Sequence, residues 1–212
     1  MLWIYAVCAL TLLICLPFFM HYKKELRYRL AASFKTLGTL AAASLALTAA
    51  VRLDPRCWVC FAALMLHAVA DYLLEFNLWW GEGFFLAGHV CYIAFFTNLF
   101  PVSVIHLIAV VLLLGIVVFL FWRWKKAFGD RMLPFAVYAA MLAVTTACAI
   151  GGLSAHTLQG QLIAMGGALF FISDTFVLAR LLFSADRSVD WTIMILYYIA
   201  QLLFGISCLF AY

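Results

Sequence analysis

The stretch from Gly83 to Trp122 contains no aspartate, glutamate, lysine or arginine. As a single helix it would be about 60 Å long, which is about twice the thickness of the hydrocarbon core of a bilayer. Asn98 and Pro101 lie near its middle, and proline removes a backbone donor and disfavours a helical conformation at the preceding residue. The stretch therefore predicts two consecutive membrane-spanning helices that separate near Pro101.

Apolar segments of this kind recur along the chain, which is 69% hydrophobic and only 10% charged. Soluble domains average about 45–50% apolar residues, so a soluble fold of this length could not bury so much apolar surface. A spanning helix needs about 20 predominantly apolar residues. We therefore predict an all-α, polytopic transmembrane helical bundle of about eight helices, forming a single transmembrane domain over residues 1–212. The segments that meet the requirement are 2–20, 30–51, 57–78, 83–100, 102–122, 132–152, 162–183 and 191–212.

Basic residues are concentrated in the odd-numbered loops of this arrangement. Four lie between the first two helices, four between the fifth and sixth, and two near the last loop, whereas only Arg52 and Arg56 lie on the opposite side. Because cytoplasmic loops carry an excess of lysine and arginine, we expect the odd loops to be cytoplasmic and both termini to lie outside, in a bacterial inner membrane or a eukaryotic endomembrane. No basic stripe typical of nucleic-acid binding occurs, so membrane lipids are the expected surroundings and nucleic acid is not an expected partner. The basic residues of the odd loops are Lys23, Lys24, Arg27, Arg29, Arg123, Lys125, Lys126, Arg131, Arg180 and Arg187.

Similar residues recur at an interval of about 105 positions. With four helices in each half, the two halves would have the same orientation in the membrane, as in repeats related by an axis along the membrane normal. The sequence thus suggests a possible 4+4 parallel internal repeat. The matching positions are Lys35 and Tyr138, Asp71 and Asp174, and the Tyr-Ile-Ala triplets that begin at Tyr92 and Tyr198.

Three ionisable residues, Lys35, Asp71 and Asp174, lie well inside predicted spans. Such residues cost about 2.5–3.5 kcal/mol each on the insertion scale and are functional candidates by default. Counting residues from the predicted helix ends places them, with other polar side chains, in one layer roughly 9–15 Å inside the cytoplasmic edge. The alternative is that these groups only hold the helices together by ion pairs and hydrogen bonds. The other polar members are His89, Tyr92, Tyr138, Ser173, Tyr197, Tyr198 and Gln201.

The layer contains two acids and only one lysine, so one carboxyl lacks a charge partner. Burial favours the neutral form of such a carboxyl, whereas Lys35 favours the ionised form of the other. A protonated acid beside an ionised carboxylate is the arrangement that general acid–base catalysis requires. We therefore predict Asp71 and Asp174 as the catalytic pair, without deciding which is the acid.

A metal site is the less favoured interpretation of the same helices. His67 and Asp71 share one helix face at spacing i, i+4, and with His89 they could supply ligands to zinc. Zinc hydrolases within membranes usually need more histidines, and Cys57 and Cys60 have metal or redox spacing without a second such pair. We expect no metal and no cofactor, and a metal-dependent intramembrane lipid hydrolase remains an alternative.

The polar residues belong to short motifs whose order and spacing resemble the lysoplasmalogenase (YhhN-like) family of eight-helix membrane proteins. The resemblance runs from Lys35 to Gln201. It implies hydrolysis of the vinyl-ether bond of a lysoplasmalogen, an alkenyl-glycerophosphocholine or -ethanolamine, to a fatty aldehyde and a glycerophospho-alcohol. The motifs are Lys35, Asp71-Tyr-Leu-Leu74, Gly88-His89-Val-Cys-Tyr92, Tyr138-Ala-Ala-Met141, Ser173-Asp174 and Tyr198-Ile-Ala-Gln201.

The chemistry of that reaction agrees with the residues. Vinyl-ether hydrolysis begins with protonation of an alkene carbon, and water then attacks the resulting oxocarbenium ion. The reaction therefore needs one acid and one carboxylate, as glycosidases do. Lys35 would keep one aspartate ionised or contact the phosphate, and the remaining polar residues of the layer would orient water and the lysophospholipid substrate. A small-solute or proton-coupled transporter is the leading alternative, because a repeat and a polar layer also suit alternating access.

Overall fold

The computed structural model describes residues 2–183 and 187–210, and the side chain of Arg187 is not described. Within these residues the regular structure is helical and contains no strand. A π-helical segment, η1 (Leu10–Cys15), joins the first two helices without a break, and the turns η2 (Gly129–Arg131), η3 (Gly152–Ala155) and η4 (Cys208–Phe210) are 3-10 helices. The α-helices are α1 (Leu2–Ala9), α2 (Leu16–Lys24), α3 (Tyr28–Arg52), α4 (Cys57–Leu74), α5 (Leu78–Leu99), α6 (Val104–Phe128), α7 (Met132–Gly151), α8 (Leu158–Leu182) and α9 (Arg187–Ser207).

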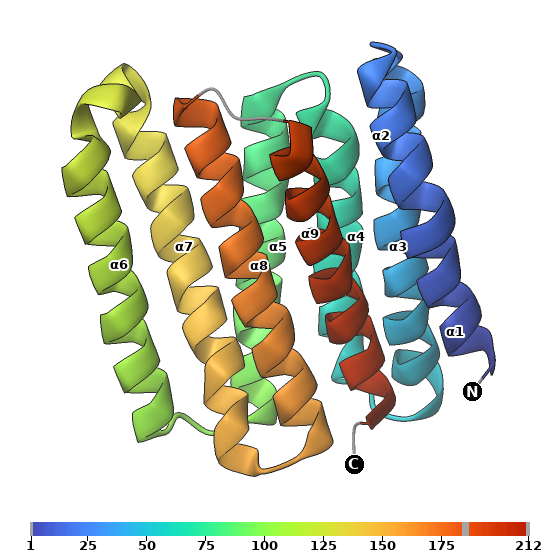
Figure 1. The fold of residues 1–212 in the computed structure, drawn as a ribbon. Helices are drawn as coiled ribbons and strands as arrows, with labels where there is room; N and C mark the ends of the chain where they lie inside the picture. Colours follow the sequence, from blue (N-terminus) through green and yellow to red (C-terminus); the bar gives the residue numbers. More distant parts are fainter. Residues whose placement is uncertain (1, 184–186, 211–212) are drawn as a thin grey trace.

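The helices form one bundle in which α1 and α2 continue in one direction and the chain reverses direction at each later connection between helices (Figure 1). The start of α1 and the end of α9 lie at the bottom of the view, and the α2–α3 and α6–α7 connections lie at the top. Eight of the ten basic residues assigned to the odd loops lie in these two connections or in the helix ends beside them. The bundle therefore groups the basic loops at one end, as the predicted topology requires, whereas the side of the membrane that this end faces stays a prediction.

The predicted separation near Pro101 is confirmed. Helix α5 ends at Leu99, and α6 begins at Val104. Ser103 and His106 form a capping box at the start of α6, in which the backbone N–H of Ser103 donates to His106 Nδ1 at 3.1 Å. The proline stops one helix, and the capping pair starts the next.

The expected number of about eight spanning helices requires correction. Six stretches of the described residues are long and apolar enough to cross a membrane, and one of them, residues 104–155, comprises both α6 and α7. Dividing that stretch gives seven helices. Helix α5 does not qualify, because polar side chains such as Glu82, His89 and Asn98 lower its mean hydropathy. The end of the last predicted span, at residue 212, lies outside the described residues.

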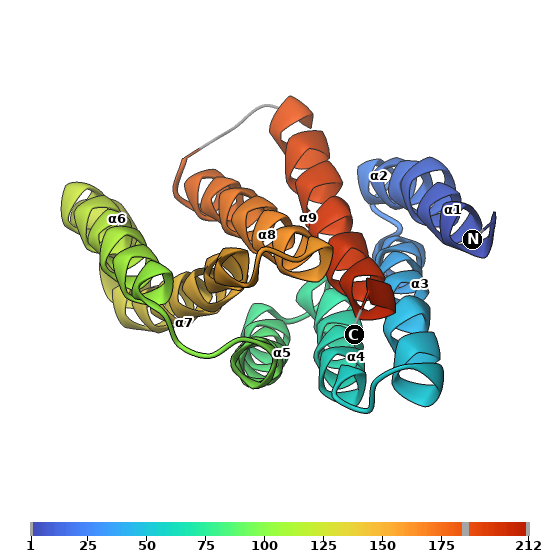
Figure 2. The ribbon, with the colours of Figure 1, turned by 90° about the horizontal axis from the view of Figure 1, so that it is seen from below.

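Helices from distant parts of the chain are brought together by α5 and α9. Seen along the bundle, α5 lies between α4 and α7, and α9 lies between α8 and α3 (Figure 2). Each half of the chain thus has the same order of neighbouring helices. That order does not establish a duplicated sequence, and the internal repeat stays a prediction.

Two glycines allow the close approach of helices around the polar residues. A Cβ atom at Gly38 of α3 would lie 2.6 Å from the Tyr198 ring of α9, and a Cβ atom at Gly88 of α5 would lie 2.2 Å from the His67 ring of α4. Small residues are common at helix contacts in membranes for this reason. The Tyr198 and His67 rings can therefore occupy these positions only because Gly38 and Gly88 have no side chain.

Candidate active site

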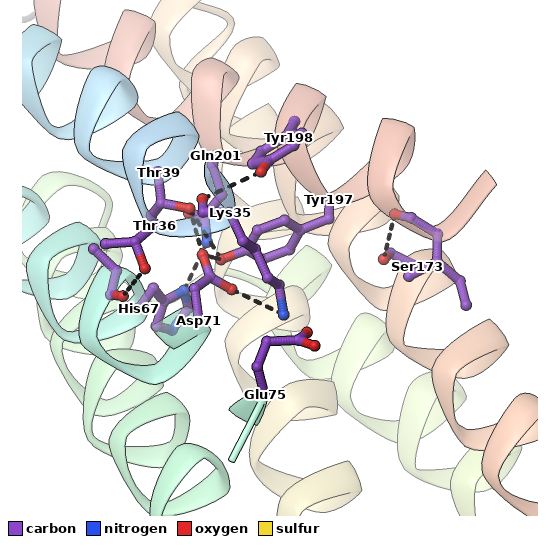
Figure 3. Close-up of polar contacts among 12 residues, drawn as sticks. Lys35, Thr36, Thr39, His67, Asp71, Glu75, Ser173, Tyr197, Tyr198 and Gln201 are labelled. Atoms are coloured by element: carbon purple, nitrogen blue, oxygen red, sulfur yellow. Dashed lines mark hydrogen bonds and ion pairs between the residues drawn. The ribbon is translucent and has the colours of Figure 1, made fainter. Parts of the chain in front are cut away.

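Asp71 is fully buried and binds side chains from two other helices (Figure 3). Its Oδ2 accepts hydrogen bonds from the Tyr197 hydroxyl of α9 at 2.7 Å and from Thr39 Oγ1 of α3 at 2.5 Å. Lys35 Nζ, also on α3, lies 3.3 Å from Oδ1. An ammonium and two hydroxyl donors stabilise negative charge on this carboxylate.

The local sequence explains how α3 supplies two partners. Lys35 and Thr39 are four residues apart, so they lie on the same face of the helix. Thr36, which is also on α3, donates its hydroxyl hydrogen to the Ala68 carbonyl of α4 at 3.2 Å. Because Ala68 lies one turn before Asp71, this bond fixes the height of α3 relative to α4 at the site.

Asp174 of α8 has a different environment. The Tyr138 hydroxyl of α7 donates a short hydrogen bond to Asp174 Oδ2. Asp174 forms no ion pair among the side chains that the structure describes. The preceding Ser173 donates to the Ile193 carbonyl of α9 at 3.0 Å, which holds α8 against α9 beside the carboxyl. The two aspartates therefore differ in their direct partners among the described side chains: Asp71 contacts an ammonium, and Asp174 contacts a neutral hydroxyl donor.

Both aspartates line one cavity of about 130 Å³. A buried water molecule needs about 10–15 Å³ by the same measure, so the cavity has room for several water molecules or for a polar fragment of a substrate. Its apolar wall includes Val117 and Phe121 of α6, Phe135 of α7 and Leu178 of α8. The arrangement combines a polar end for chemistry with an apolar wall suited to a hydrocarbon chain.

The structure brings six of the ten predicted site residues into the wall of this cavity. Three of the remaining four do not line the cavity and form hydrogen bonds to other protein groups: Tyr92, Tyr198 and Gln201. The Tyr198 hydroxyl, for example, donates to the backbone carbonyl of Lys35 at 3.2 Å. The six that line the cavity are Lys35, Asp71, Tyr138, Ser173, Asp174 and Tyr197.

Three side chains that do not line the cavity form a hydrogen-bonded row that connects α5, α9 and α4: Tyr92, Gln201 and His67. The Tyr92 hydroxyl of α5 donates to Gln201 Oε1 of α9 at 2.8 Å, and Gln201 Nε2 lies 2.9 Å from His67 Nδ1 of α4. His89, the fourth predicted residue outside the wall, packs edge to face against the His67 ring, with ring centres 5.1 Å apart. This row joins the helices that carry the site without itself facing the cavity.

The donors for a metal are not assembled among the described residues. No group of three histidine, cysteine, aspartate or glutamate side chains there is placed to hold an ion. His67 Nδ1 is bonded to Gln201, and the His67 and His89 rings pack edge to face instead of pointing their nitrogens at a common point. The predicted alternative of a metal-dependent hydrolase therefore lacks a ligand set in this part of the chain.

Two residues of the site were missed by the sequence analysis. Thr39 could have been found from its spacing to Lys35. Glu82 was assigned to a loop because the predicted span began at residue 83, but α5 begins five residues earlier, at Leu78. The available signal was Asn77, whose side chain caps the helix by accepting from the backbone N–H groups of the next turn.

Fold and site together define a multi-pass helical membrane protein in which two aspartates, Asp71 fully buried and Asp174 partly buried, line one cavity. The YhhN family model matches residues 30–208, from the beginning of α3 to η4. The chain belongs to the YhhN family, which includes lysoplasmalogenases. Nothing among the curated proteins or the solved structures matched the chain. All the residues that bind Asp71 and Asp174 lie within the matched region.

Proposed function

We propose that this protein is a membrane-embedded hydrolase that cleaves the vinyl-ether bond of a lysoplasmalogen, releasing a fatty aldehyde and a glycerophospho-alcohol. The observation that carries the proposal is the unequal environment of two aspartates on one cavity. Asp71 is paired with Lys35, whereas the partner of Asp174 among the described side chains is the Tyr138 hydroxyl. Membership of the YhhN family supports the same reaction class.

These environments assign the acid and the base. Asp174, which has no cationic partner among the described side chains, is the group that carries a proton, because even partial burial disfavours an isolated charge. Asp71 is the carboxylate, because the Lys35 ammonium and two hydroxyl donors stabilise its charge. Its Oδ1 faces the Lys35 ammonium at 3.3 Å and accepts no hydrogen bond from another described residue.

The reaction then follows in balanced steps. Asp174 transfers its proton to the alkene carbon that is not bonded to oxygen, and the other alkene carbon becomes part of an oxocarbenium ion. Asp71 takes a proton from a water molecule as the water oxygen bonds to that carbon, which forms a hemiacetal. The hemiacetal hydroxyl loses its proton, the bond to the glycerol oxygen breaks, and that oxygen is protonated. One water molecule is consumed, and the proton on Asp71 returns to Asp174 through solvent.

In this mechanism the hydrocarbon chain of the substrate lies along the apolar cavity wall that α6, α7 and α8 form. We also propose that the end of the bundle with the basic loops faces the cytoplasm, so that the lysolipid comes from the cytoplasmic leaflet. Lys35 and Asp71 lie in the halves of α3 and α4 nearest that end. The scissile bond of an amphiphile near the membrane surface lies at a similar depth.

The test is release of free aldehyde by the purified protein from an alkenyl-glycerophosphoethanolamine. The saturated alkyl-ether analogue is the matched control, because it has no alkene carbon to protonate and should release nothing. A chelator should leave the rate unchanged if aspartates alone carry out the chemistry. Absence of aldehyde from a folded preparation would contradict the proposal, and complete inhibition by the chelator would favour the metal-dependent alternative.

A further inference from the structure

Glu82 is a third carboxylate on the cavity, and the mechanism above does not use it. Its side chain is only 9% exposed, and it lines the same cavity as Asp71 and Asp174. Neither of its carboxylate oxygens has a hydrogen-bond partner among the described residues. Buried charges in proteins are normally paired, because an unpaired one loses its hydration without compensation. Glu82 is therefore a candidate to form an ion pair with a bound ligand.

The charges around the cavity specify the sign of that ligand group. Lys35 is the only basic residue among the described residues of the cavity wall, and it is already paired with Asp71. Like Asp174, Glu82 has no cationic partner among the described side chains, so its ionised form needs a positive charge that a ligand would bring. A cationic group on the substrate would neutralise it in a partly desolvated site, where ion pairs are stronger than in water.

Its depth agrees with contact to a head group. Asp71 lies three residues before the end of α4, and Glu82 lies four residues after the start of the antiparallel α5. At 1.5 Å per residue the two carboxylates are at nearly the same level in the bundle. A lysolipid with its ether bond at the aspartates would therefore place its head group across the cavity, toward α5, at the level of Glu82.

The hydrogen bonds that Glu82 can accept indicate which kind of cationic head group it would bind. Both oxygens of Glu82 need donors, and a primary ammonium has three N–H groups, whereas a trimethylammonium group has none. We propose that Glu82 binds the primary ammonium of an ethanolamine head group and makes the cavity selective for ethanolamine over choline lysolipids. This proposal rests on the proposed function, since it assumes a lysolipid substrate.

The experiment measures binding and does not depend on hydrolysis. Three saturated alkyl-ether lysolipids are compared on the purified protein, with ethanolamine, choline and unsubstituted phosphate as head groups. We expect the wild type to bind the ethanolamine lipid about tenfold more tightly than the other two, the amount expected for a hydrogen bond to a charged group. Glu82→Gln should abolish this preference, and Glu82→Asp, which keeps the charge on a shorter side chain, should retain part of it.

Glu75→Gln provides the matched control. Glu75 lies just after the end of α4 and pairs with Lys23 at 2.9 Å, and it does not line the cavity. This variant loses a carboxylate close to Glu82 in sequence and should keep the tenfold preference. Equal binding of all three lipids by the wild type, or an unchanged preference in Glu82→Gln, would overturn the assignment. Selective binding without aldehyde release from the alkenyl lipid would instead refute the proposed reaction and leave the role of Glu82 standing.

Discussion

The pairing of Lys35 with Asp71 can be tested by removing the charge of the lysine alone. Lys35→Met leaves a fully buried carboxylate without its cation, and breaking a buried pair in this way typically costs about 3–5 kcal/mol of folding free energy. Asp71 keeps its bonds from Thr39 and Tyr197, so we expect the lower end of that range, about 3 kcal/mol. For a chain of this size such a loss lowers Tm by about 6–12 °C.

A double-mutant cycle separates this charge effect from lost packing. Lys35→Met with Asp71→Asn removes both charges and should recover most of the stability, although not the activity. The control is Arg27→Met, since Arg27 also pairs with a glutamate, Glu25, but the two side chains are 62% and 42% exposed, and exposed pairs contribute at most about 1 kcal/mol. Thermal unfolding in detergent measures each variant. The reasoning is refuted if Lys35→Met is as stable as the wild type, or if the double variant is no more stable than Lys35→Met.

Three further predictions concern catalysis, topology and packing. Asp71→Asn and Asp174→Asn should each reduce aldehyde release by at least about a hundredfold in folded protein, and the double variant should be little worse, because members of one catalytic unit are not additive. A cysteine at Ser154 should react with an impermeant thiol reagent from outside the cell, whereas a cysteine at Ser188 should react only after permeabilisation. Gly38→Ala should destabilise the protein by about 1–3 kcal/mol, because the added Cβ would lie 2.6 Å from a tyrosine ring.

Each of these has its own control. The aspartate variants should still bind a saturated ether analogue, and near-normal turnover in either of them would show that this aspartate is not catalytic. Reversed labelling would place the basic loops outside. Gly115→Ala is the control for the glycine, since no atom lies within 4 Å of its added Cβ. Equal stability of the two alanine variants would show that α3 and α9 have room to separate.

The membrane-spanning class and the polar layer were predictable, because both follow from where charges are absent or unexpectedly present. The uncharged stretch with Pro101 correctly predicted two helices, and Lys35, Asp71 and Asp174 were recognisable as ionisable groups inside spans. The number of spanning helices was overestimated, since hydropathy assigned α5 by its apolar second half and disregarded the polar start that carries Glu82.

Side-chain direction was the part that could not be predicted. Depth along a helix follows from counting residues, but rotation about its axis depends on packing against neighbours. Tyr198 and Gln201 belong to the predicted layer, yet Tyr198 bonds to the backbone carbonyl of Lys35 and Gln201 to His67, and neither lines the cavity. The close approach that permits this depends on glycines such as Gly38, whose contacts are with distant segments of the chain.

Each aspartate meets a donor from the helix that precedes it in the chain, Lys35 for Asp71 and Tyr138 for Asp174. The two carboxyls are alike in this respect, and they differ in the charge of that donor and in the further bonds that Asp71 accepts from Thr39 and Tyr197. A lysine brings a full positive charge, whereas a tyrosine brings a neutral donor. Two acids of the same kind can therefore be made unequal by the residue that the preceding helix presents to each, without a second type of acidic side chain.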